Sequence, residues 1–265
     1  MASRWAPWAG HRINFAAGGQ TAWQRALELV VELPPYRTLE KLLGAARALV
    51  SAADAIDVPD APMGLPAPSS AVVSAIIRSQ VSPPPEVIAH LRLLDVSELG
   101  ALNVARALEL VGVPRLVLLR GDVPSLGDPC RGVPEKVMQT IRSQGLSLRL
   151  GLLLSLAKPI DEVMRRIEAR ADFYLVTRPW RSPALKEVSS RARAAGSKVY
   201  VYLVVETQRN AQALAGLPRD EKVRVAEVAD AVRHLSGVVD GVIISSPGDK
   251  ESLLAALREA RAVTG

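Results

Sequence analysis

The chain has 265 residues, of which 49% are apolar, and carries a net charge of +6. These values exclude an intrinsically disordered protein, and the single cysteine excludes both an intrachain disulfide and a cysteine-based zinc site. The basic excess is spread over charged helical stretches and aromatic residues make up only 4%, so we expect no nucleic-acid binding.

The N-terminal stretch shows no regular apolar pattern. Trp5, Trp8 and the pair Gly18-Gly19 indicate an irregular or disordered arm, and the stretch lacks the apolar core of a signal peptide. No apolar run elsewhere is long enough to cross a bilayer without a charge or a turn. We therefore expect an arm over residues 1–24, a barrel domain over 25–265, and a cytoplasmic protein that does not bind membranes.

After the arm, short β-branched or leucine-rich runs alternate with amphipathic stretches. Thr38 is placed to cap the first amphipathic stretch, and Gly196 to end a later one. This alternation predicts parallel strands joined by helices. Strands are predicted at 27–32, 55–58, 87–92, 116–119, 148–156, 173–177, 198–205 and 241–245. Helices are predicted at 39–50, 71–77, 97–111, 134–145, 160–169, 183–195 and 250–262.

The number and spacing of these units favour a single closed (β/α)8 TIM barrel over a doubly wound open sheet. The strands are apolar throughout, as parallel strands buried on both faces require. In such a barrel the functional side chains gather where the strands end, at the C-terminal face. The polar residues at those positions are Glu32, Asp57 or Asp60, His90 or Arg92, Arg120 with Asp122, Ser155, Thr177 or Arg178, Glu206 and Ser245.

Glu32 and Asp122 are the leading catalytic candidates, because they would converge from the first and fourth strands. A carboxyl group over an apolar barrel floor loses solvation, which raises its pKa and allows it to act as a general acid near neutral pH. From position alone, a structural ion pair with Arg120 or Arg92 is an equally good interpretation of each carboxylate. Gly121 would let the backbone approach a ligand closely.

The sequence contains no dinucleotide-binding fingerprint, no phosphate-binding loop and no HExxH motif. Its three histidines are scattered one by one, so no metal site is expected. His90, near the end of the third strand, could contact a cofactor or be a hydrogen-bonded core histidine.

Four short motifs occur in order along the first two thirds of the chain. They are Val31-Glu32-Leu33-Pro34-Pro35 at the first strand, Ala89-His90-Leu91 with Asp95 at the third, Leu119-Arg120-Gly121-Asp122-Val123-Pro124 at the fourth, and Ala171-Asp172-Phe173 with Val176-Thr177 at the sixth. With these motifs, the chain resembles the methylenetetrahydrofolate reductase family from about Glu28 to Arg178.

The resemblance implies a flavin-dependent barrel enzyme of one-carbon metabolism. In this family NADH or NADPH reduces FAD, and the flavin passes hydride to the methylene carbon of methylenetetrahydrofolate. The resemblance implies that Glu32 protonates the folate nitrogen and opens the five-membered ring. It also implies that Asp122 lies near flavin and folate, and that His90, Arg120 and Gly121 line the flavin pocket.

Three positions differ from the family pattern. The second strand is followed by an Asp-x-Pro-x-Gly loop that begins at Asp60, where typical members have a Tyr-Gly-Ala turn. Arg92 replaces the usual threonine, and Thr177-Arg178-Pro179 replaces the glutamine pattern that grips the pterin. We therefore expect a compact member in which Asp60 and Thr177 contact the cofactor.

The partner of this site is expected to be a tetrahydropterin substrate. Two alternatives stay open, a flavin-free pterin reductase and a non-catalytic pterin- or flavin-binding subunit of a larger complex. Homo-oligomerisation and an electron-transfer partner are left open as well.

Overall fold

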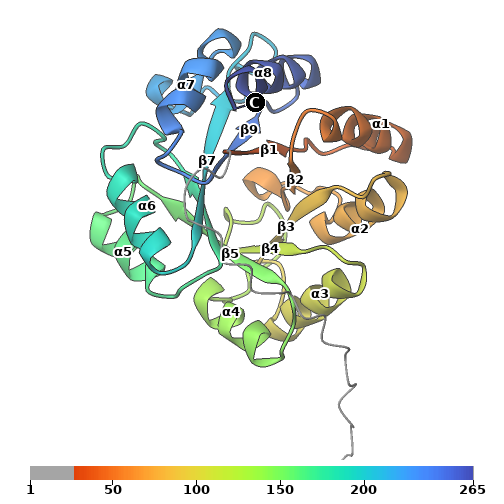
Figure 1. Ribbon diagram of the computed structural model, residues 1–265. Helices are drawn as coiled ribbons and strands as arrows, with labels where there is room; N and C mark the ends of the chain where they lie inside the picture. Colours follow the sequence, from red (N-terminus) through yellow and green to blue (C-terminus); the bar gives the residue numbers. More distant parts are fainter. Residues whose placement is uncertain (1–26, 265) are drawn as a thin grey trace, which may run out of the picture.

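The computed structural model describes residues 27–264, which form a closed barrel of parallel strands (Figure 1). The predicted N-terminal arm lies outside the described residues. Closure is complete because the last long strand, β9, pairs with both β1 and β7, and β7 pairs in turn with β6. This confirms the predicted (β/α)8 barrel. The strands are β1 (Glu28–Glu32), β2 (Ala55–Val58), β3 (Glu86–Arg92), β4 (Arg115–Leu119), β5 (Arg149–Ser155), β6 (Phe173–Thr177), β7 (Lys198–Val205), β8 (Lys222–Val223) and β9 (Gly241–Ser245).

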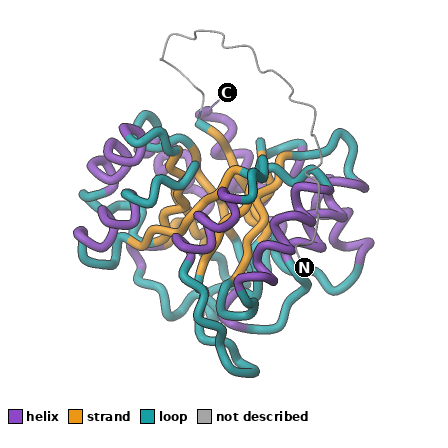
Figure 2. Tube along the Cα trace, turned by 90° about the horizontal axis from the view of Figure 1, so that it is seen from below, coloured by secondary structure: helices purple, strands orange, loops and turns teal. Residues whose placement is uncertain are grey.

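Helices surround the barrel on its outside (Figures 1 and 2). Thr38 caps the first of them by accepting a hydrogen bond from the Lys41 amide, as predicted. Gly196 follows α6 with a φ of +85°, a conformation that suits glycine. The helices are α1 (Leu39–Val50), α2 (Ser70–Gln80), α3 (Glu98–Leu110), α4 (Pro134–Ser143), α5 (Ile160–Ile167), α6 (Leu185–Ala194), α7 (Val228–Leu235) and α8 (Lys250–Thr264), with short 3-10 turns η1 (Pro62–Gly64), η2 (Arg219–Glu221) and η3 (Val225–Glu227).

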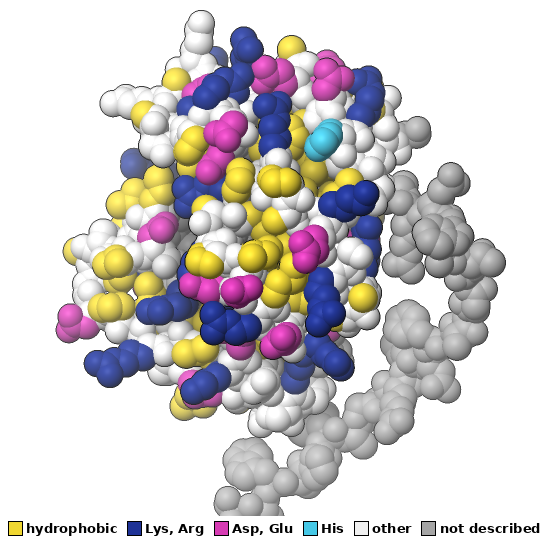
Figure 3. Space-filling view, turned by 90° about the vertical axis from the view of Figure 1, so that its left-hand side faces the viewer, with side chains coloured by type: hydrophobic (Ala, Val, Ile, Leu, Met, Phe, Trp, Pro, Cys, Tyr) yellow, Lys and Arg dark blue, Asp and Glu magenta, His cyan; other side chains and the backbone are white. Residues whose placement is uncertain are grey.

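The basic residues lie mostly among acidic ones. Arg166 Nε is 2.6 Å from Glu135 Oε1, and Arg193 Nε is 3.3 Å from Asp240 Oδ1. On the face drawn in Figure 3, Lys and Arg side chains are likewise interspersed with Asp and Glu. The basic excess of the charged helical stretches therefore lies on surfaces of mixed charge.

The connection after β7 contains elements that were not predicted from the sequence. The chain forms η2, the two-residue strand β8 and η3, and then the helix α7, where no helix was expected. Strand β8 pairs in parallel with the C-terminal end of β7, with Val204 opposite Lys222. Lys222 is buried and its Nζ lies 2.6 Å from Glu206 Oε1. A strand of two residues is too short to produce a recognisable apolar period, so the sequence pattern could not reveal it.

The strands separate two apolar regions. Outward-facing side chains pack against the helices in a large core, and inward-facing ones fill the lumen of the barrel. Alternation along parallel strands produces this division, because successive side chains point to opposite faces. The lumen residues are Val30, Ala55, Ile88, Val117, Phe173, Leu175, Tyr200 and Ile243.

An ion-pair network closes the lumen at the N-terminal ends of the strands. The buried Arg115 places Nη1 2.7 Å from Glu28 Oε1, and Tyr200 donates a hydrogen bond of 2.7 Å to Glu28 Oε2. Glu86 on β3 and Lys198 on β7 extend the network. These contacts lower the pKa of Glu28 against the opposing effect of burial. Among the described residues, the network therefore caps the lumen at the N-terminal ends of the strands.

Packing inside the lumen depends on Gly151 of β5, which makes room for the ring of Phe173. A Cβ atom at this position would overlap the Phe173 ring. We predict that Gly151→Ala lowers the free energy of unfolding by about 1–3 kcal/mol, the usual cost of overpacking a filled core. Chemical denaturation monitored by circular dichroism measures this change.

Gly44→Ala is the matched control for this prediction. Gly44 is exposed within α1, and a Cβ atom there would meet nothing within 4 Å. Alanine is the better helix former by up to about 1 kcal/mol, so Gly44→Ala should be neutral or stabilising. Equal effects of the two substitutions would contradict the packing role of Gly151.

Candidate active site

Five side chains from five strands meet at the C-terminal end of the lumen. We call this opening the mouth and the five residues the mouth cluster. Glu32 of β1 lies directly opposite Asp57 of β2 in the strand register. Since both side chains point inward, the two carboxyl groups are neighbours at the top of the lumen. The mouth cluster consists of Glu32, Asp57, His90, Tyr202 and Ser245.

Asp57 is the centre of the mouth cluster and is fully buried. One carboxylate oxygen lies 2.7 Å from His90 Nε2, and the other accepts a hydrogen bond of 2.8 Å from the Tyr202 hydroxyl. A buried carboxylate needs this kind of compensation, because its loss of hydration is otherwise costly. The two donors therefore fix Asp57 in place as an acceptor.

Tyr202 reaches Asp57 from the far side of the barrel. In the strand order, β9 and β1 separate its strand, β7, from β2. The backbone of Tyr202 is in register with Ile243, which is in register with Val30, one inward position below Glu32. The tyrosine side chain thus packs against the apolar lumen residues and reaches Asp57 with its hydroxyl group.

Glu32 accepts a hydrogen bond of 2.7 Å from the Ser245 hydroxyl of β9. Burial raises the pKa of Glu32 to about 7, and the negative charge of Asp57 adds to the increase. The Ser245 hydrogen bond and the charge of His90 act in the opposite direction. A carboxyl group with this pKa is protonated in a large fraction of molecules at neutral pH, so Glu32 can donate a proton there.

His90 experiences opposing effects. Burial lowers its pKa, but the charge of Asp57 and the hydrogen bond to it outweigh burial, so the pKa of His90 lies above its usual value. The backbone amide of His90 is held as well, by a bond of 2.9 Å to the Ser70 hydroxyl. His90 is therefore a hydrogen-bonded histidine of the barrel interior, as one of the two interpretations of its sequence position expected, and its contact with a cofactor stays a prediction.

Arg120, Gly121 and Asp122 lie in the loop after β4 and are exposed. Among the described residues, no hydrogen bond or ion pair joins Asp122 to Glu32. Gly121 has a φ of +81°, and a Cβ atom there would lie 2.7 Å from Arg92 Cδ. The glycine thus allows the loop to cover the buried Arg92 side chain.

Arg92 is covered from two sides. Its Nη1 donates to the Ala61 carbonyl oxygen at 3.1 Å, and its Nε lies 3.1 Å from Asp95 Oδ2 at an angle that makes no hydrogen bond. The loop after β2 also meets the loop after β4, since the Ser125 amide donates to the Gly64 carbonyl oxygen at 3.0 Å. The two loops form one rim over β3.

The remaining predicted cofactor contacts have protein partners in this structure. Asp60 accepts hydrogen bonds from the amides of Arg92 and Ser70, at 2.9 and 3.5 Å, and so ties its loop to β3 and α2. Thr177, at the end of β6, is half-buried and donates to the Leu154 carbonyl oxygen at 3.4 Å. Asp60 therefore shapes the rim, while Thr177 is bonded to the neighbouring strand β5.

Sequence reasoning placed Glu32 and His90 at strand ends but did not single out Tyr202. The available signal was the alternation along β7, which points Lys198, Tyr200 and Tyr202 to the same side. The ion-pair partners of Lys198 and Tyr200 show that this side is the lumen.

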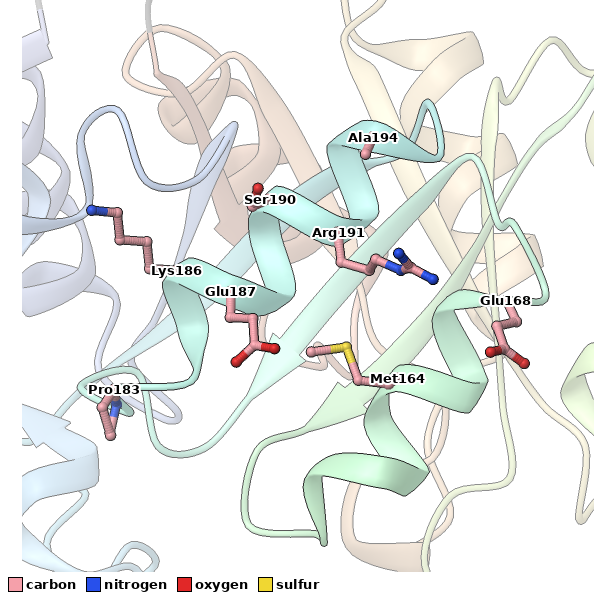
Figure 4. Close-up of a pocket in the computed structure, with 8 residues that line it drawn as sticks. All are labelled: Met164, Glu168, Pro183, Lys186, Glu187, Ser190, Arg191 and Ala194. Carbon is pink, nitrogen blue, oxygen red and sulfur yellow. The ribbon is translucent and has the colours of Figure 1, made fainter.

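Other features of the described residues do not suggest a second site of this kind. Within 27–264, no three His, Cys, Asp or Glu side chains group closely enough to hold a metal ion. No helix in that range has the length and apolar character to span a membrane. A groove of about 800 Å³ lies between α5 and α6, where Lys186, Glu187 and Arg191 line it far from the mouth cluster (Figure 4). Its charged lining is that of a solvated helix surface.

No protein-family model matches the sequence, and no protein of curated function matches it. Among solved structures, the chain is similar to an uncharacterized protein from Clostridium thermocellum that binds two copies of 5-methyl-5,6,7,8-tetrahydrofolic acid. The TM-score is 0.62 and the identity 11%, over 90% of this chain and 96% of that chain.

Two other similar structures are enzymes. Tryptophan synthase from Mycobacterium tuberculosis matches with a TM-score of 0.56 and 20% identity, over 90% of this chain and 93% of that one. KGPDC from Streptococcus mutans matches with a TM-score of 0.56 and 17% identity, over 91% and 100% of the two chains. At these identities the likeness shows the barrel fold alone.

The raised pKa of Glu32 predicts a specific pH dependence of stability. Folded Glu32 keeps its proton up to about pH 7, whereas an unperturbed glutamate loses it near 4.5. The folded state therefore binds more protons in this interval, and the free energy of unfolding falls as the pH rises through it. The loss amounts to roughly 3 kcal/mol between pH 4.5 and 8.

Glu32→Gln should remove this component, because the amide does not ionise and can still accept from Ser245. We expect the stability of Glu32→Gln relative to the native chain to increase by most of that amount between pH 5 and 8, measured by urea denaturation. Glu162→Gln on the surface of α5 is the control and should leave the pH dependence unchanged. A relative stability of Glu32→Gln that is constant with pH would refute the buried, protonated state.

Proposed function

We propose that this protein binds a tetrahydropterin at the mouth and reduces its methylene form to the methyl form, with FAD as hydride relay. The observation that carries the proposal is the half-buried Glu32 at the end of β1, which lies opposite Asp57 and has a pKa of about 7. The four motifs shared with methylenetetrahydrofolate reductase support it. The folate-binding barrel from Clostridium thermocellum supports the pterin part of the proposal, as a protein of the same fold.

Glu32 supplies the proton in this reaction. A methylene-tetrahydropterin holds its one-carbon unit between two nitrogens, and protonation of one nitrogen opens the five-membered ring to an iminium ion. The methylene carbon then accepts hydride and becomes a methyl group, while Glu32 is left as a carboxylate. The Ser245 hydroxyl stabilises that carboxylate through its hydrogen bond.

The rim offers suitable groups for FAD. Arg120 is exposed, and no described residue pairs with its guanidinium, so it can contact an anionic group such as the pyrophosphate. Four large apolar side chains, Met63, Leu65, Val123 and Leu126, are exposed on the two rim loops and suit a planar ring system. When bound, FAD would carry hydride from NADH or NADPH to the pterin. Asp122 on the same loop would place a negative charge near the ring.

The first test is binding. We expect the purified protein to take up FAD, with its visible absorbance, and to bind 5-methyltetrahydrofolate in isothermal titration calorimetry. Protein that binds the folate without FAD would indicate a flavin-free reductase or a binding subunit. Protein that binds neither ligand would exclude the proposal.

The second test separates the two half-reactions. Glu32→Gln should abolish oxidation of the reduced flavin by methylenetetrahydrofolate, because the proton donor is gone, while reduction of the flavin by NAD(P)H continues. Stopped-flow absorbance measures each half-reaction separately. Glu162→Gln should behave as the native protein in both. Loss of both half-reactions in Glu32→Gln would argue against a proton-donor role.

A further inference from the structure

The mouth cluster contains more titratable groups than a single proton donor requires. Three of them, Asp57, His90 and Tyr202, form one hydrogen-bonded unit that crosses the barrel from β7 to β2 and β3. Asp57 and His90 are buried and Tyr202 is half-buried, although a surface location would avoid the cost of desolvating them. Their placement next to Glu32 suggests that they act on it.

The geometry brings the unit against Glu32 without a direct bond. Glu32 and Asp57 are opposite one another on neighbouring strands, and both side chains point into the lumen. Glu32 is hydrogen-bonded to Ser245 on its other side, and no described residue bridges the two carboxyl groups. The unit therefore influences Glu32 through its charges.

We propose that Asp57 and His90 are positioning residues that control, with opposite sign, how readily Glu32 releases its proton, and that Tyr202 holds Asp57 in place. A carboxylate beside Glu32 disfavours ionisation of Glu32, and an imidazolium favours it. The groups that face Glu32 and His90 are Asp57 on β2, Asp60 in the loop after β2, Tyr202 on β7 and Ser245 on β9. Asp57 lies opposite Glu32 in the strand register and is in contact with His90.

The charges of Asp57 and His90 act on the pKa of Glu32 in the directions that this proposal requires. The charge of Asp57 raises the pKa of Glu32, and that of His90 lowers it. The pKa of Tyr202 lies well above its usual value, because burial and then the charge of Asp57 disfavour the phenolate. Tyr202 is thus a neutral hydrogen-bond donor at any working pH, so it orients Asp57 without adding charge.

The test is a direct titration of Glu32 in the free protein. Protein labelled with 13C at the glutamate carboxyl carbon is titrated by NMR, and the Glu32 signal is identified by its absence in Glu32→Gln. In the native chain we expect a midpoint near pH 7. Asp57→Asn should lower the midpoint by about one unit, a tenfold change in the proton equilibrium.

The other variants should change the titration midpoint of Glu32 in other directions or leave it unchanged. His90→Gln should raise the midpoint, because the site loses its cation, and Tyr202→Phe should leave it near its native value, because no charge changes. Asp128→Asn, in an exposed loop, removes the same charge as Asp57→Asn at a distance and should have no effect. Thermal melting of each variant shows whether it is folded.

This titration can fail or succeed independently of the proposed function. The role of the Glu32 proton in catalysis rests on the proposed function, but the titration needs no substrate, flavin or activity. An unchanged midpoint in folded Asp57→Asn, or a lower midpoint in His90→Gln, would overturn the inference. Opposite shifts in the two variants would establish it even if the protein does not reduce a pterin. A merely structural role would produce unfolding or equal shifts instead.

Discussion

Closure of eight parallel strands is the constraint on which this structure depends. Because β9 pairs with both β1 and β7, every second side chain on each strand must enter a narrow lumen. Apolar residues satisfy this requirement in the middle, and an ion-pair network does so at one end. At the other end the same alternation forces Glu32 and Asp57 together, since they occupy opposite positions in the register. The register of the strands therefore determines which polar side chains lie side by side in the site.

The sequence contained enough information for the architecture but only part of the site. Runs of apolar residues at regular spacing revealed the eight long strands, because parallel barrel strands are buried on both faces. Glu32 and His90 could be found as polar residues at strand ends. The bond from Tyr202 to Asp57 could not, because it joins residues 145 positions apart across the lumen. Only the completed register, with its inward-facing set of residues, brings these two side chains into contact.

The loops after β2 and β4 show a second limit of prediction from the sequence. Their positions at strand ends suggested that Asp122 and Glu32 would converge, but a strand end determines where a loop begins and not the path that the loop takes. In the structure, Asp122 is exposed on the rim, and the buried position nearby belongs to Arg92. Gly121 explains the arrangement, because its missing side chain lets the loop close over the arginine. Asp60 has a related role, as its carboxylate ties the opposite loop to β3. Residues expected to bind a ligand thus also shape the opening through which it would enter.

The ion-pair network around Arg115 has a consequence for proton traffic. It caps the lumen behind the mouth cluster, at the N-terminal ends of the strands. A ligand bound over Glu32, as proposed above, would lie between that carboxyl group and solvent. A proton that Glu32 gave to such a ligand would be replaced from solvent after the ligand has left. Under the proposed function, reprotonation of Glu32 would therefore be coupled to ligand release, with one proton given for each ligand bound.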